Sequence, residues 1–423
     1  MNIEKLKAGL IRSAKKAQDA SRFLLSLSQE KKNDVLRGMS EALLAKKEYI
    51  LKANDKDVKK AASLGNTDAF IDRLRLDQKR IGEMAEALLE LTRLHDPVGE
   101  VIREWYRPNG LKIRKVRTPI GVIAIIYESR PNVTSDCIGL CFKSGNSVIL
   151  RGGSEALNSN SAIFKVLKTV IKKHGIPEGA INLVSVSDRK AVGELLKLND
   201  YIDLVMPRGG EGLIKLVMKC SRIPVIKHYK GICHVYVDEW ADLNIAQKVC
   251  FNAKVQRPGT CNAMETMLVH KEAAVRFLPW MLKQFEGAGV QIRGCALTRK
   301  IGKAFSIKKA EDKDYRREYL DLILSVKVVE SLEQAIKHIN EYGSRHSDSI
   351  ITEDEKSAAL FLKQVDSACV YVNASTRFTD GYQFGLGSEI GISTDKLHAR
   401  GPMGLEELTT YKYMVFGNGQ VRT

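Results

Sequence analysis

Residues 119–134 read Pro119-Ile120-Gly121-Val122-Ile123-Ala124-Ile125-Ile126-Tyr127-Glu128-Ser129-Arg130-Pro131-Asn132-Val133-Thr134, and the part from 121 to 127 is the longest apolar stretch of the chain. It falls far short of the roughly 20 residues that cross a bilayer, so it predicts a buried strand. A helical pattern follows as far as Lys143, and apolar runs alternate with helical patterns from there on. This rhythm predicts βαβ units around a parallel sheet.

The alternation can be followed through most of the chain. Further strands of the first sheet are expected at 148–150, 181–184 and 202–206, with helices at 162–173 and 191–196 between them. A second series of strands is expected at Val235–Val237, Met267–Val269, Val326–Val329, Asp348–Thr352 and Val370–Asn373. The sequence therefore predicts an α/β fold with two parallel-sheet domains.

Three segments differ from this pattern. The first hundred residues have apolar positions at helical spacing. Residues 101–117 form two extended segments around Pro108-Asn109-Gly110, and Asn-Gly between alternating residues is a strong hairpin signal, so a long two-stranded arm is expected. The tail from Lys396 to Thr423 contains one extended run, Tyr411–Phe416.

The composition limits the classes of partner. A chain of 423 residues, 44% hydrophobic and 28% charged, is long enough for two domains, and 67 Lys+Arg against 50 Asp+Glu give +17. That charge favours anionic ligands such as nucleotides or acyl phosphates. Basic and acidic residues are interleaved, as in Glu30-Lys31-Lys32-Asn33-Asp34, so we expect solvated faces and no nucleic-acid partner. The N-terminus lacks the pattern of a secretory signal, so we expect a cytoplasmic protein without a membrane partner.

The eight cysteines include no CxxC pair, so neither a disulfide framework nor a metal site is expected. Cys137 and Cys141 are four residues apart on one face of an expected helix, where core packing is the favoured interpretation. Cys261 differs from them, because it stands in the polar loop Gln256-Arg257-Pro258-Gly259-Thr260-Cys261-Asn262-Ala263-Met264-Glu265 just before an apolar strand.

Cys261 is the candidate nucleophile. A thiolate attacks carbonyl carbon well once cations or dipoles make it available at neutral pH, and Lys254 and Arg257 are near in sequence. Backbone amides beside it could stabilise the oxyanion of a tetrahedral adduct. A cysteine–histidine hydrolase remains an alternative, although the spacing of His228, His234 and His398 favours none of them.

No G-x-G-x-x-G follows a predicted strand into a helix; Gly385-Leu386-Gly387-Ser388-Glu389-Ile390-Gly391 has the wrong spacing and is expected to be a loop. Two other glycine turns follow strands and open helices. Each brings amides, a helix N-terminus and an arginine to a place where a phosphate could bind. These candidate cofactor turns are Arg151-Gly152-Gly153-Ser154 and Arg208-Gly209-Gly210.

Several of these segments together resemble the gamma-glutamyl phosphate reductases. The resemblance lies in 119–134, in Ser144-Gly145-Asn146-Ser147-Val148-Ile149-Leu150-Arg151-Gly152-Gly153, in 256–265, in Val372-Asn373-Ala374-Ser375-Thr376-Arg377-Phe378-Thr379-Asp380-Gly381 and in Lys396-Leu397-His398-Ala399-Arg400-Gly401-Pro402-Met403-Gly404. It extends from about residue 1 to the C-terminus. That family belongs to the aldehyde dehydrogenase superfamily, whose members bind their nucleotide without G-x-G-x-x-G.

The resemblance implies an aldehyde dehydrogenase-like fold with a cofactor domain, a catalytic domain and a β-hairpin oligomerisation arm. The nucleotide-binding domain would comprise 1–97 and 119–228, and the catalytic domain with the cysteine nucleophile would comprise 229–395. The arm and the C-terminal tail would comprise 98–118 and 396–423. A homo-oligomer, dimer or larger, is expected, and a glutamate kinase that hands over its labile product is a candidate partner.

The implied reaction is NADPH-dependent reduction of L-glutamate 5-phosphate to glutamate 5-semialdehyde and phosphate, a step of proline synthesis. Cys261 matches the family's nucleophile; its thiolate would expel phosphate and leave a thioester, which hydride then reduces to the aldehyde. The general-base glutamate of hydrolytic relatives is missing, because Val225-Ile226-Lys227-His228-Tyr229-Lys230-Gly231 contains no carboxylate. Its absence fits an enzyme that reduces its thioester.

The resemblance also suggests roles for other residues. Asn132 is the candidate side-chain oxyanion donor, with a helix-capping role as the alternative. Arg151, and Ser154 where NAD-preferring relatives often have glutamate, favour NADP(H), and Asp321 resembles the carboxylate that holds the nicotinamide ribose, although a surface aspartate is the alternative. The phosphate and α-carboxylate of the substrate call for cations, each of which has a structural ion pair as its alternative. The candidate substrate-binding residues are Arg130, Lys254, Ser375, Arg377 and Arg400.

Two other functions stay open. A hydrolytic NAD-dependent aldehyde dehydrogenase would have the same fold but no need for phosphate. A basic nucleic-acid-binding protein would be retained on DNA or RNA in a salt-sensitive way. A scaffold without turnover is a third alternative, and the intact loop around Cys261 argues against it.

Overall fold

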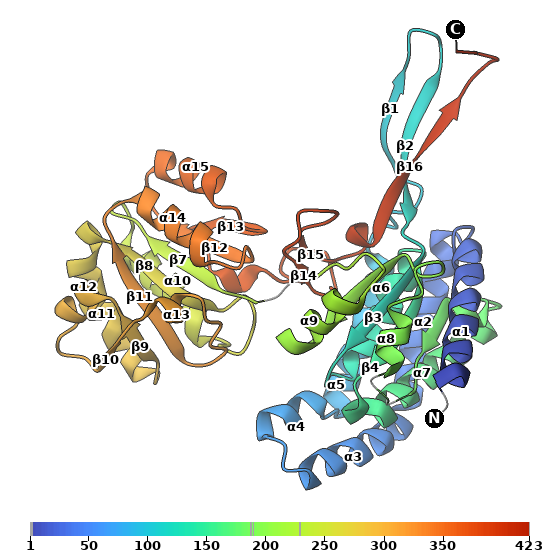
Figure 1. The fold of residues 1–423 in the computed structure, drawn as a ribbon, viewed down its shortest axis with the longest axis horizontal. Coiled ribbons are helices and arrows are strands. Elements are labelled where there is room, and N and C mark those ends of the chain that lie inside the picture. Colours follow the sequence, from blue (N-terminus) through green and yellow to red (C-terminus); the bar gives the residue numbers. More distant parts are fainter. Residues whose placement is uncertain (1–2, 187, 189, 228–229, 423) are drawn as a thin grey trace. The chain divides into compact units, whose positions relative to one another are not determined.

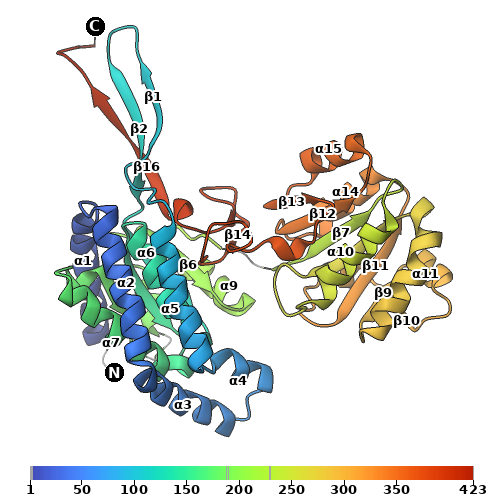
Figure 2. The same cartoon turned by 180° about the vertical axis from the view of Figure 1, so that it is seen from behind.

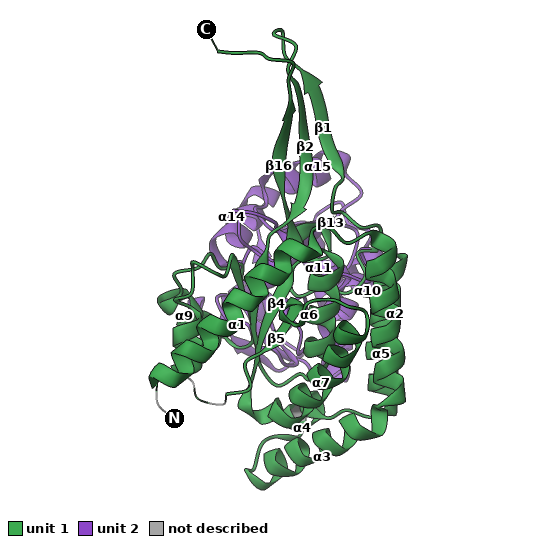
Figure 3. Ribbon diagram, turned by 90° about the vertical axis from the view of Figure 1, so that its right-hand side faces the viewer, with its two compact units in different colours: residues 1–227, 385–391, 403–423 green, residues 228–384, 392–402 purple. Residues whose placement is uncertain are grey.

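The computed structural model of the protein describes residues 3–186, 188, 190–227 and 230–422. Their contacts divide the chain into two compact units, one made of 1–227, 385–391 and 403–423 and the other of 228–384 and 392–402 (Figure 3). Among the helices of the described residues, none is both long enough and apolar enough to cross a membrane.

The first unit is built on a four-stranded parallel sheet with the order β5-β4-β3-β6 (Figure 1). The stretch quoted first forms its central strand, which is buried along its whole length. Strand β3 is followed outward by β4 and β5 on one side, while β6 lies on its other side, so the strand order reverses at β3. The strands are β3 (Val122–Tyr127), β4 (Ser147–Gly152), β5 (Ile181–Leu183) and β6 (Leu204–Arg208).

Helices cover both faces of this sheet. One face packs against α1 (Ile3–Leu24), α8 (Lys190–Leu195) and α9 (Glu211–Cys220) through a core that includes Val122, Ala124 and Ile126. The other carries α6 (Asn132–Lys143) and α7 (Leu157–Lys173), over which α2 (Gln29–Ala45) and α5 (Gln78–Arg93) pack. The remaining elements of the unit are α3 (Lys47–Ser63), α4 (Asp68–Leu74), and the 3-10 turns η1 (Ser154–Ala156), η2 (Glu178–Ala180) and η4 (Glu406–Leu408).

The expected hairpin arm has a third strand. Strand β1 (Val101–Tyr106) pairs with β2 (Lys112–Pro119), and β16 (Thr409–Phe416) from the C-terminal tail pairs with the other edge of β2, all antiparallel. Figure 2 shows this ribbon extending away from the helices of its unit. The sequence predicted β16 as an extended run, but its partner lies nearly 300 positions away and no local pattern identifies it. The role of the arm in oligomerisation stays a prediction.

The second unit contains a seven-stranded parallel sheet with the order β10-β9-β11-β8-β7-β12-β13. Five of its strands lie where the sequence predicted them, whereas β9 and β10 are short and have no apolar run to reveal them. The strands are β7 (Cys233–Val237), β8 (Met264–His270), β9 (Gln291–Gly294), β10 (Ile307–Lys309), β11 (Ile323–Val329), β12 (Ser347–Ile351) and β13 (Cys369–Val372). The helices are α10 (Leu243–Val255), α11 (Lys271–Gly287), α12 (Ala296–Ile301), α13 (Asp312–Tyr315), α14 (Leu332–Tyr342) and α15 (Glu355–Gln364), and η3 is Thr376–Phe378.

The boundary between the units near the C-terminus differs from the expected one. The expected catalytic domain included 385–391, yet this segment belongs to the first unit, where the amide of Ile390 donates to the carbonyl of Met403 at 3.1 Å. Residues 396–402, expected with the arm, belong to the second unit, because β15 (Gly401–Pro402) pairs with β14 (Ile392–Ser393). Hydrogen bonds between distant segments set this boundary, and the sequence does not display them.

Glycine at position 179 is required by close packing against α1. A Cβ there would overlap the carbonyl oxygen of Lys16, which belongs to the helix backbone and cannot turn away. We expect Gly179→Ala to destabilise the protein by about 1–3 kcal/mol, as overpacking does. Gly9→Ala in α1 is the matched control: open space surrounds that position, and a gain of roughly 0.5–1 kcal/mol is expected. Urea unfolding of the two variants checks the signs, and equal midpoints would contradict the packing argument.

Candidate active site

Cys261 is partly exposed in the loop between α10 and β8, and two neighbouring residues contact its backbone carbonyl. A Cβ at Gly231 would overlap the carbonyl group of Cys261, so only glycine permits this approach. The thiol of Cys233, on the neighbouring strand β7, donates to the same carbonyl oxygen at 3.2 Å. Burial raises the pKa of Cys233, which keeps it a thiol and therefore a donor. The nucleophile candidate thus stands on a fixed backbone.

Asn262 ties the same loop to the turn η3. Its amide donates to the carbonyls of Arg377 and Thr379, at 3.2 and 2.9 Å, and its own carbonyl accepts from the Thr376 hydroxyl at 2.7 Å. The Oδ1 of Asn262 accepts from the Thr260 hydroxyl and from a guanidinium nitrogen of Arg377. The side chain of Asn262 is fully satisfied, and it fixes Cys261 relative to Arg377.

Arg377 is the cation that the structure brings to the nucleophile loop. Its Nε donates to Gln256 at 2.9 Å, and its side chain is half-buried. Burial and the charge of Arg257 lower the pKa of Arg377, whereas the charges of Cys261 and Asp380 oppose this. Because such an interaction is mutual, the guanidinium favours the thiolate form of Cys261.

Lys254 and Glu265 form a buried ion pair behind the loop. Their nitrogen and oxygen are 2.8 Å apart, and both side chains are fully buried. Burial lowers the pKa of Lys254 and raises that of Glu265 to about 7, while the partner's charge opposes each shift. Glu265 also accepts from the amides of Tyr319 and Leu320. The sequence predicted Lys254 at the substrate, but the structure encloses its ammonium in the core, where it pairs with Glu265.

The other predicted site residues of this unit differ in their hydrogen-bond and ion-pair partners. The buried hydroxyl of Ser375 accepts from the amide of Arg377 and caps η3. Arg400 donates twice to Asp366, at 2.9 Å each, so the ion-pair alternative describes its contacts. Asp321 is exposed just before β11, and its carboxylate accepts from the amide of Leu322.

A carboxylate that is distant in sequence, that of Glu318, lies near the loop of Cys261. Glu318 comes from the segment before β11, and its Oε1 accepts from the amide of Gly231 at 2.8 Å. Gly231 in turn packs against the carbonyl of Cys261. The contacts of Glu318, Asn262 and Cys233 could not be predicted from the sequence, because they depend on strand neighbours and loops that are distant in the chain.

Asn132 begins α6 in the first unit, where it does not cap the helix. Its amide donates to the carboxylate of Asp136 at 2.9 Å, and α6 begins without a side-chain cap. Burial raises the pKa of Asp136 to about 6, against hydrogen bonds from Asn132 and Ser135 and the charge of Arg208. An amide nitrogen has two hydrogens, so bonding to Asp136 leaves Asn132 a second one for an oxyanion. The capping alternative is wrong, and the oxyanion role stays a prediction.

Both predicted glycine turns lie at the carboxyl edge of the four-stranded sheet. Ligands of such sheets bind at the point where the strand order reverses, which here is the edge between β3 and β6. Arg208 ends β6 and Gly210 follows it, while Arg130 is exposed in the turn after β3. Arg208 packs close to Gly391, so it serves a structural contact as well.

Carboxylates of the chain itself occupy parts of these turns. The amide of Gly210 donates to Glu128 at 2.8 Å, and a Cβ at Gly209 would overlap that same carboxylate. After β4, Glu155 accepts from the amide and hydroxyl of Ser129 at 2.7 and 3.1 Å, and a Cβ at Gly153 would overlap its carboxylate. The two acids therefore lie against the glycines of these turns, a contact that the motif alone did not reveal.

The residues predicted to bind the adenosine end of a nucleotide lie in the turn at the end of β4. Arg151 is the next-to-last residue of β4, with 8% of its surface exposed, and Gly152 leaves room for the amide of Asn160. Ser154 is exposed at the start of η1. A ligand at this edge of the sheet would meet a cation, a hydroxyl and glycine backbone.

The histidine alternative has no support within residues 230–422. His234 bonds to Asp348 at 2.9 Å on the buried side of the sheet, and His398 is exposed in a hairpin of the second unit. His346 lies 3.7 Å from the Sγ of Cys233, which is not the loop cysteine. His228 lies outside the described residues. Cys137 and Cys141 are buried in α6, as predicted.

The two parallel sheets and the cysteine loop are features of a known protein family, and comparison of the sequence with family models identifies it. The model of the aldehyde dehydrogenase family matches residues 6–293, more than half of the chain. The protein therefore belongs to the aldehyde dehydrogenase family and is an oxidoreductase by that membership.

Its more similar relatives form one group within that family. The gamma-glutamyl phosphate reductase of Thermodesulfovibrio yellowstonii is 57% identical over 417 residues, 99% of each chain. That of Clostridium acetobutylicum is 54% identical over 417 residues, again 99% of each. The crystal structure of gamma-glutamyl phosphate reductase from Thermotoga maritima has a TM-score of 0.95 and 48% identity, covering 98% of this chain and 100% of that one. This chain belongs with the gamma-glutamyl phosphate reductases.

The buried pair predicts a pH-dependent defect. Lys254→Met removes the cation and leaves Glu265 buried, which costs about 3–5 kcal/mol when the carboxylate is ionised. The pKa of Glu265 is higher in the folded than in the unfolded protein, so binding a proton to Glu265 stabilises the fold at low pH. This contribution is lost as the pH rises through the folded pKa. We therefore expect a smaller defect at about pH 5.5 than at about pH 8 in urea unfolding.

The double variant Lys254→Met/Glu265→Gln is the control for that experiment. It has no buried carboxylate, so it should be more stable than Lys254→Met at about pH 8, and the difference between the two variants should shrink at about pH 5.5, where Glu265 of Lys254→Met is protonated. A Lys254→Met variant as stable as the wild type at about pH 8 would show that Glu265 does not need its partner.

Proposed function

We propose that this protein reduces L-glutamate 5-phosphate to L-glutamate 5-semialdehyde and phosphate with NADPH, the second step of proline biosynthesis from glutamate. The observation that carries the proposal is the loop of Cys261, whose backbone is held by Cys233 and whose neighbour Asn262 is bonded to Arg377. Relatives named gamma-glutamyl phosphate reductase, at 53–57% identity over nearly the whole chain, supply the substrate class.

The chain's own chemistry begins at Cys261. Its thiolate attacks the acyl carbon of the substrate, the bond from that carbon to the phosphate oxygen breaks, and phosphate leaves with the electron pair. The product is a thioester on Cys261. A backbone held by Gly231, Cys233 and Asn262 keeps the sulfur in place for this attack without reorganisation. The amide of Asn132 is our candidate for the oxyanion that forms on the way.

NADP(H), when bound, supplies the hydride that turns the thioester into the aldehyde. The turn after β4 fits the adenosine end of this cofactor, because Arg151 provides a cation and Ser154 no negative charge. The nearby carboxylate of Glu155 is engaged by Ser129, which limits its repulsion of a 2′-phosphate. Arg208 at the end of β6 and the backbone amides that follow it are our candidates for binding the diphosphate, which would take the place of the Glu128 carboxylate on the Gly210 amide. The exposed Asp321 is our candidate for binding the nicotinamide ribose.

Reduction is favoured over hydrolysis by the surroundings of the thiol. Within Val225–Lys227 and Lys230–Gly231 there is no carboxylate, and Glu318, which the fold brings to Gly231, already accepts from that amide. The thioester would therefore persist until it is reduced.

The two anionic groups of the substrate need cations. Arg377 is our first candidate, because it is half-buried beside the nucleophile loop, and Arg130 at the exposed turn after β3 is the second. Ser375 lies next to Arg377 in sequence and supports its amide. Arg400 would have to give up Asp366 to bind a substrate, so its contribution requires an exchange of partners.

We also propose a cytoplasmic homo-oligomer that assembles through the β1–β2–β16 arm. The arm has unpaired outer edges on β1 and β16 and exposed aromatic residues that include Tyr106, Tyr413 and Phe416. An acyl phosphate is labile, so delivery by a glutamate kinase in contact with this enzyme is part of the proposal.

Loss of the thiol should abolish the reaction. With glutamate 5-semialdehyde and NADP+, we expect the wild type to form NADPH only when phosphate is present, because phosphate must attack the thioester in this direction. Cys261→Ser should be slower by about a thousandfold or more. Cys220→Ser, a partly exposed thiol of the first unit, is the control and should keep its activity. Phosphate-independent turnover would indicate a hydrolytic dehydrogenase, and an active Cys261→Ser would refute the thioester.

Removing the charge of Arg377 should make Cys261 less reactive. We expect Arg377→Gln to slow alkylation of Cys261 by iodoacetamide at neutral pH by roughly three- to tenfold, because the thiolate loses its cation. Arg276→Gln, an exposed arginine on α11, is the matched control. Mass spectrometry of the peptide that contains Cys261 gives the rate, and an unchanged rate in Arg377→Gln would contradict this role.

A further inference from the structure

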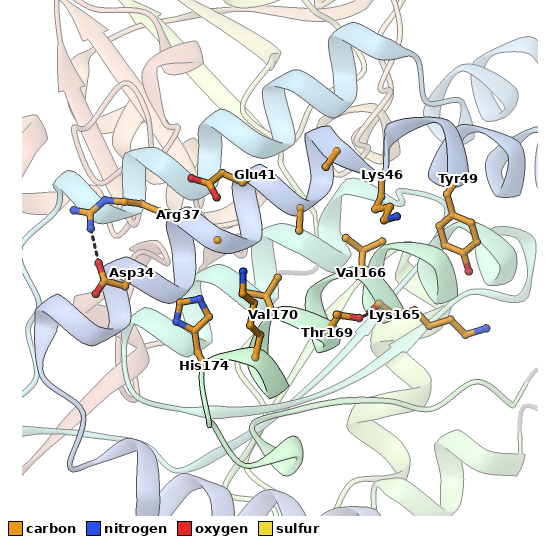
Figure 4. A pocket seen from close by; sticks show the side chains of 14 residues that line it. Asp34, Arg37, Glu41, Lys46, Tyr49, Lys165, Val166, Thr169, Val170 and His174 are labelled. Atoms are coloured by element: carbon orange, nitrogen blue, oxygen red, sulfur yellow. Dashed lines mark hydrogen bonds and ion pairs between the residues drawn. The ribbon is translucent and has the colours of Figure 1, made fainter.

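An open groove lies between α2 and α7 in the first unit, on a surface that the proposed reaction does not use (Figure 4). Its volume is about 880 Å³, within the range of roughly 300–1,000 Å³ that is typical of small-molecule sites. All its lining residues belong to α2, α3, α7 or their ends. They are Asp34, Arg37, Gly38, Glu41, Ala42, Ala45, Lys46, Tyr49, Lys165, Val166, Thr169, Val170, Lys173 and His174.

The floor of the groove is apolar and made of small side chains. Gly38, Ala42 and Ala45 follow one another at helical spacing on α2, and Val166 and Val170 face them from α7. A Cβ at Gly38 would come within 3.1 Å of both Val170 and His174, so the glycine allows the two helices to approach here. From Gly38 to Ala45 the floor extends for about 10 Å along the helix axis. Such a surface fits an elongated apolar body.

The rim carries more positive charge than its own acids can balance. Asp34 and Arg37 neutralise each other at 2.7 Å, which leaves Glu41 as the other acid of the lining. Lys46, Lys165 and Lys173 form no ion pair within the described part of the chain. Figure 4 shows Lys46, Tyr49 and Lys165 together at one end, with Asp34, Arg37 and His174 at the other. The lysine end is therefore where an anion would be held.

A helix N-terminus lies at that end. Helix α3 spans 17 residues and begins at Lys47, and its N-cap residue Lys46 provides no side-chain hydrogen bond to the first turn. Amides at such an end attract phosphate groups, but Lys46 is also the C-cap of α2, whose carbonyl end offsets the dipole of α3, so the attraction for an anion comes from the lysines. Cavity, apolar floor and lysine rim thus converge on one chemistry.

We propose that this groove is a second binding site, separate from the reaction, for a small amphiphilic phosphate. Its apolar body lies on Ala42, Ala45 and Val166, and its phosphate is held by Lys46 and Lys165. A protein partner is disfavoured by size, since 14 residues line the groove and a stable interface uses about 20–30 on each side. Helix α7 follows directly from η1 and Ser154, so a bound ligand would contact the helix next to the proposed cofactor turn.

Calorimetry with four probes on the full-length protein tests the proposal. Decyl phosphate, kept below its micelle-forming concentration, should bind at one saturable site, and decanoate more weakly at the same site. Inorganic phosphate and decyltrimethylammonium should not bind there, because one lacks the apolar body and the other has the wrong charge. Binding of the cationic probe equal to that of decyl phosphate would reduce the site to a hydrophobic patch and overturn the proposal.

Variants localise the binding. Lys165→Glu should weaken decyl phosphate by roughly five- to tenfold, and Ala42→Trp should fill the floor and abolish binding. Lys172→Glu is the matched control, since Lys172 is exposed on α7 but does not line the groove. Reductase activity without ligand, expected to be unchanged in all three, shows that they fold. Equal losses in Lys172→Glu and Lys165→Glu, no saturable binding, or retention of an acidic helical peptide in place of the phosphates would each overturn the proposal.

Discussion

The approach of Gly231 to the carbonyl of Cys261 is the constraint on which the candidate active site depends. Glycine is required there because any side chain would overlap the backbone of the nucleophile loop. The contact lets Cys233 reach the same carbonyl and brings Glu318 to the amide of Gly231. On the other side, Asn262 joins the loop to η3. The backbone that carries the sulfur is therefore fixed from two sides.

Charges around that loop serve two purposes, and burial distinguishes them. Lys254 and Glu265 neutralise each other in the core, where an unpaired charge is very unfavourable, so they fix α10 to β8. Arg377 is only half-buried and keeps a face toward the loop, so its charge acts on the thiol. Two basic residues of the second unit, Lys254 and Arg377, thus differ in their partners because one is fully buried and the other only half-buried.

Both glycine turns at the carboxyl edge of the four-stranded sheet lie close to acids of the chain that the sequence motif does not reveal. In both turns the glycines make room for an acid of the chain, Glu128 or Glu155, which uses amides or hydroxyls that a phosphate could also use. The carboxylate of Glu128 accepts from the Gly210 amide, a donor that could also bind a phosphate. Cofactor binding at the turn after β6 is then best understood as an exchange of one anion for another.

The sequence by itself determined the two parallel sheets, the hairpin, the buried cysteines of α6 and the loop of Cys261, because apolar period, turn residues and exposure are local properties. It did not reveal β9 and β10, which are too short and polar to leave a pattern, or the pairing of β16 with β2. Nor could it distinguish Lys254, whose partner is in the core, from Arg377, whose partners are on a distant turn. Tertiary structure decided those points, because burial and hydrogen bonding between remote segments exist only once the chain has folded.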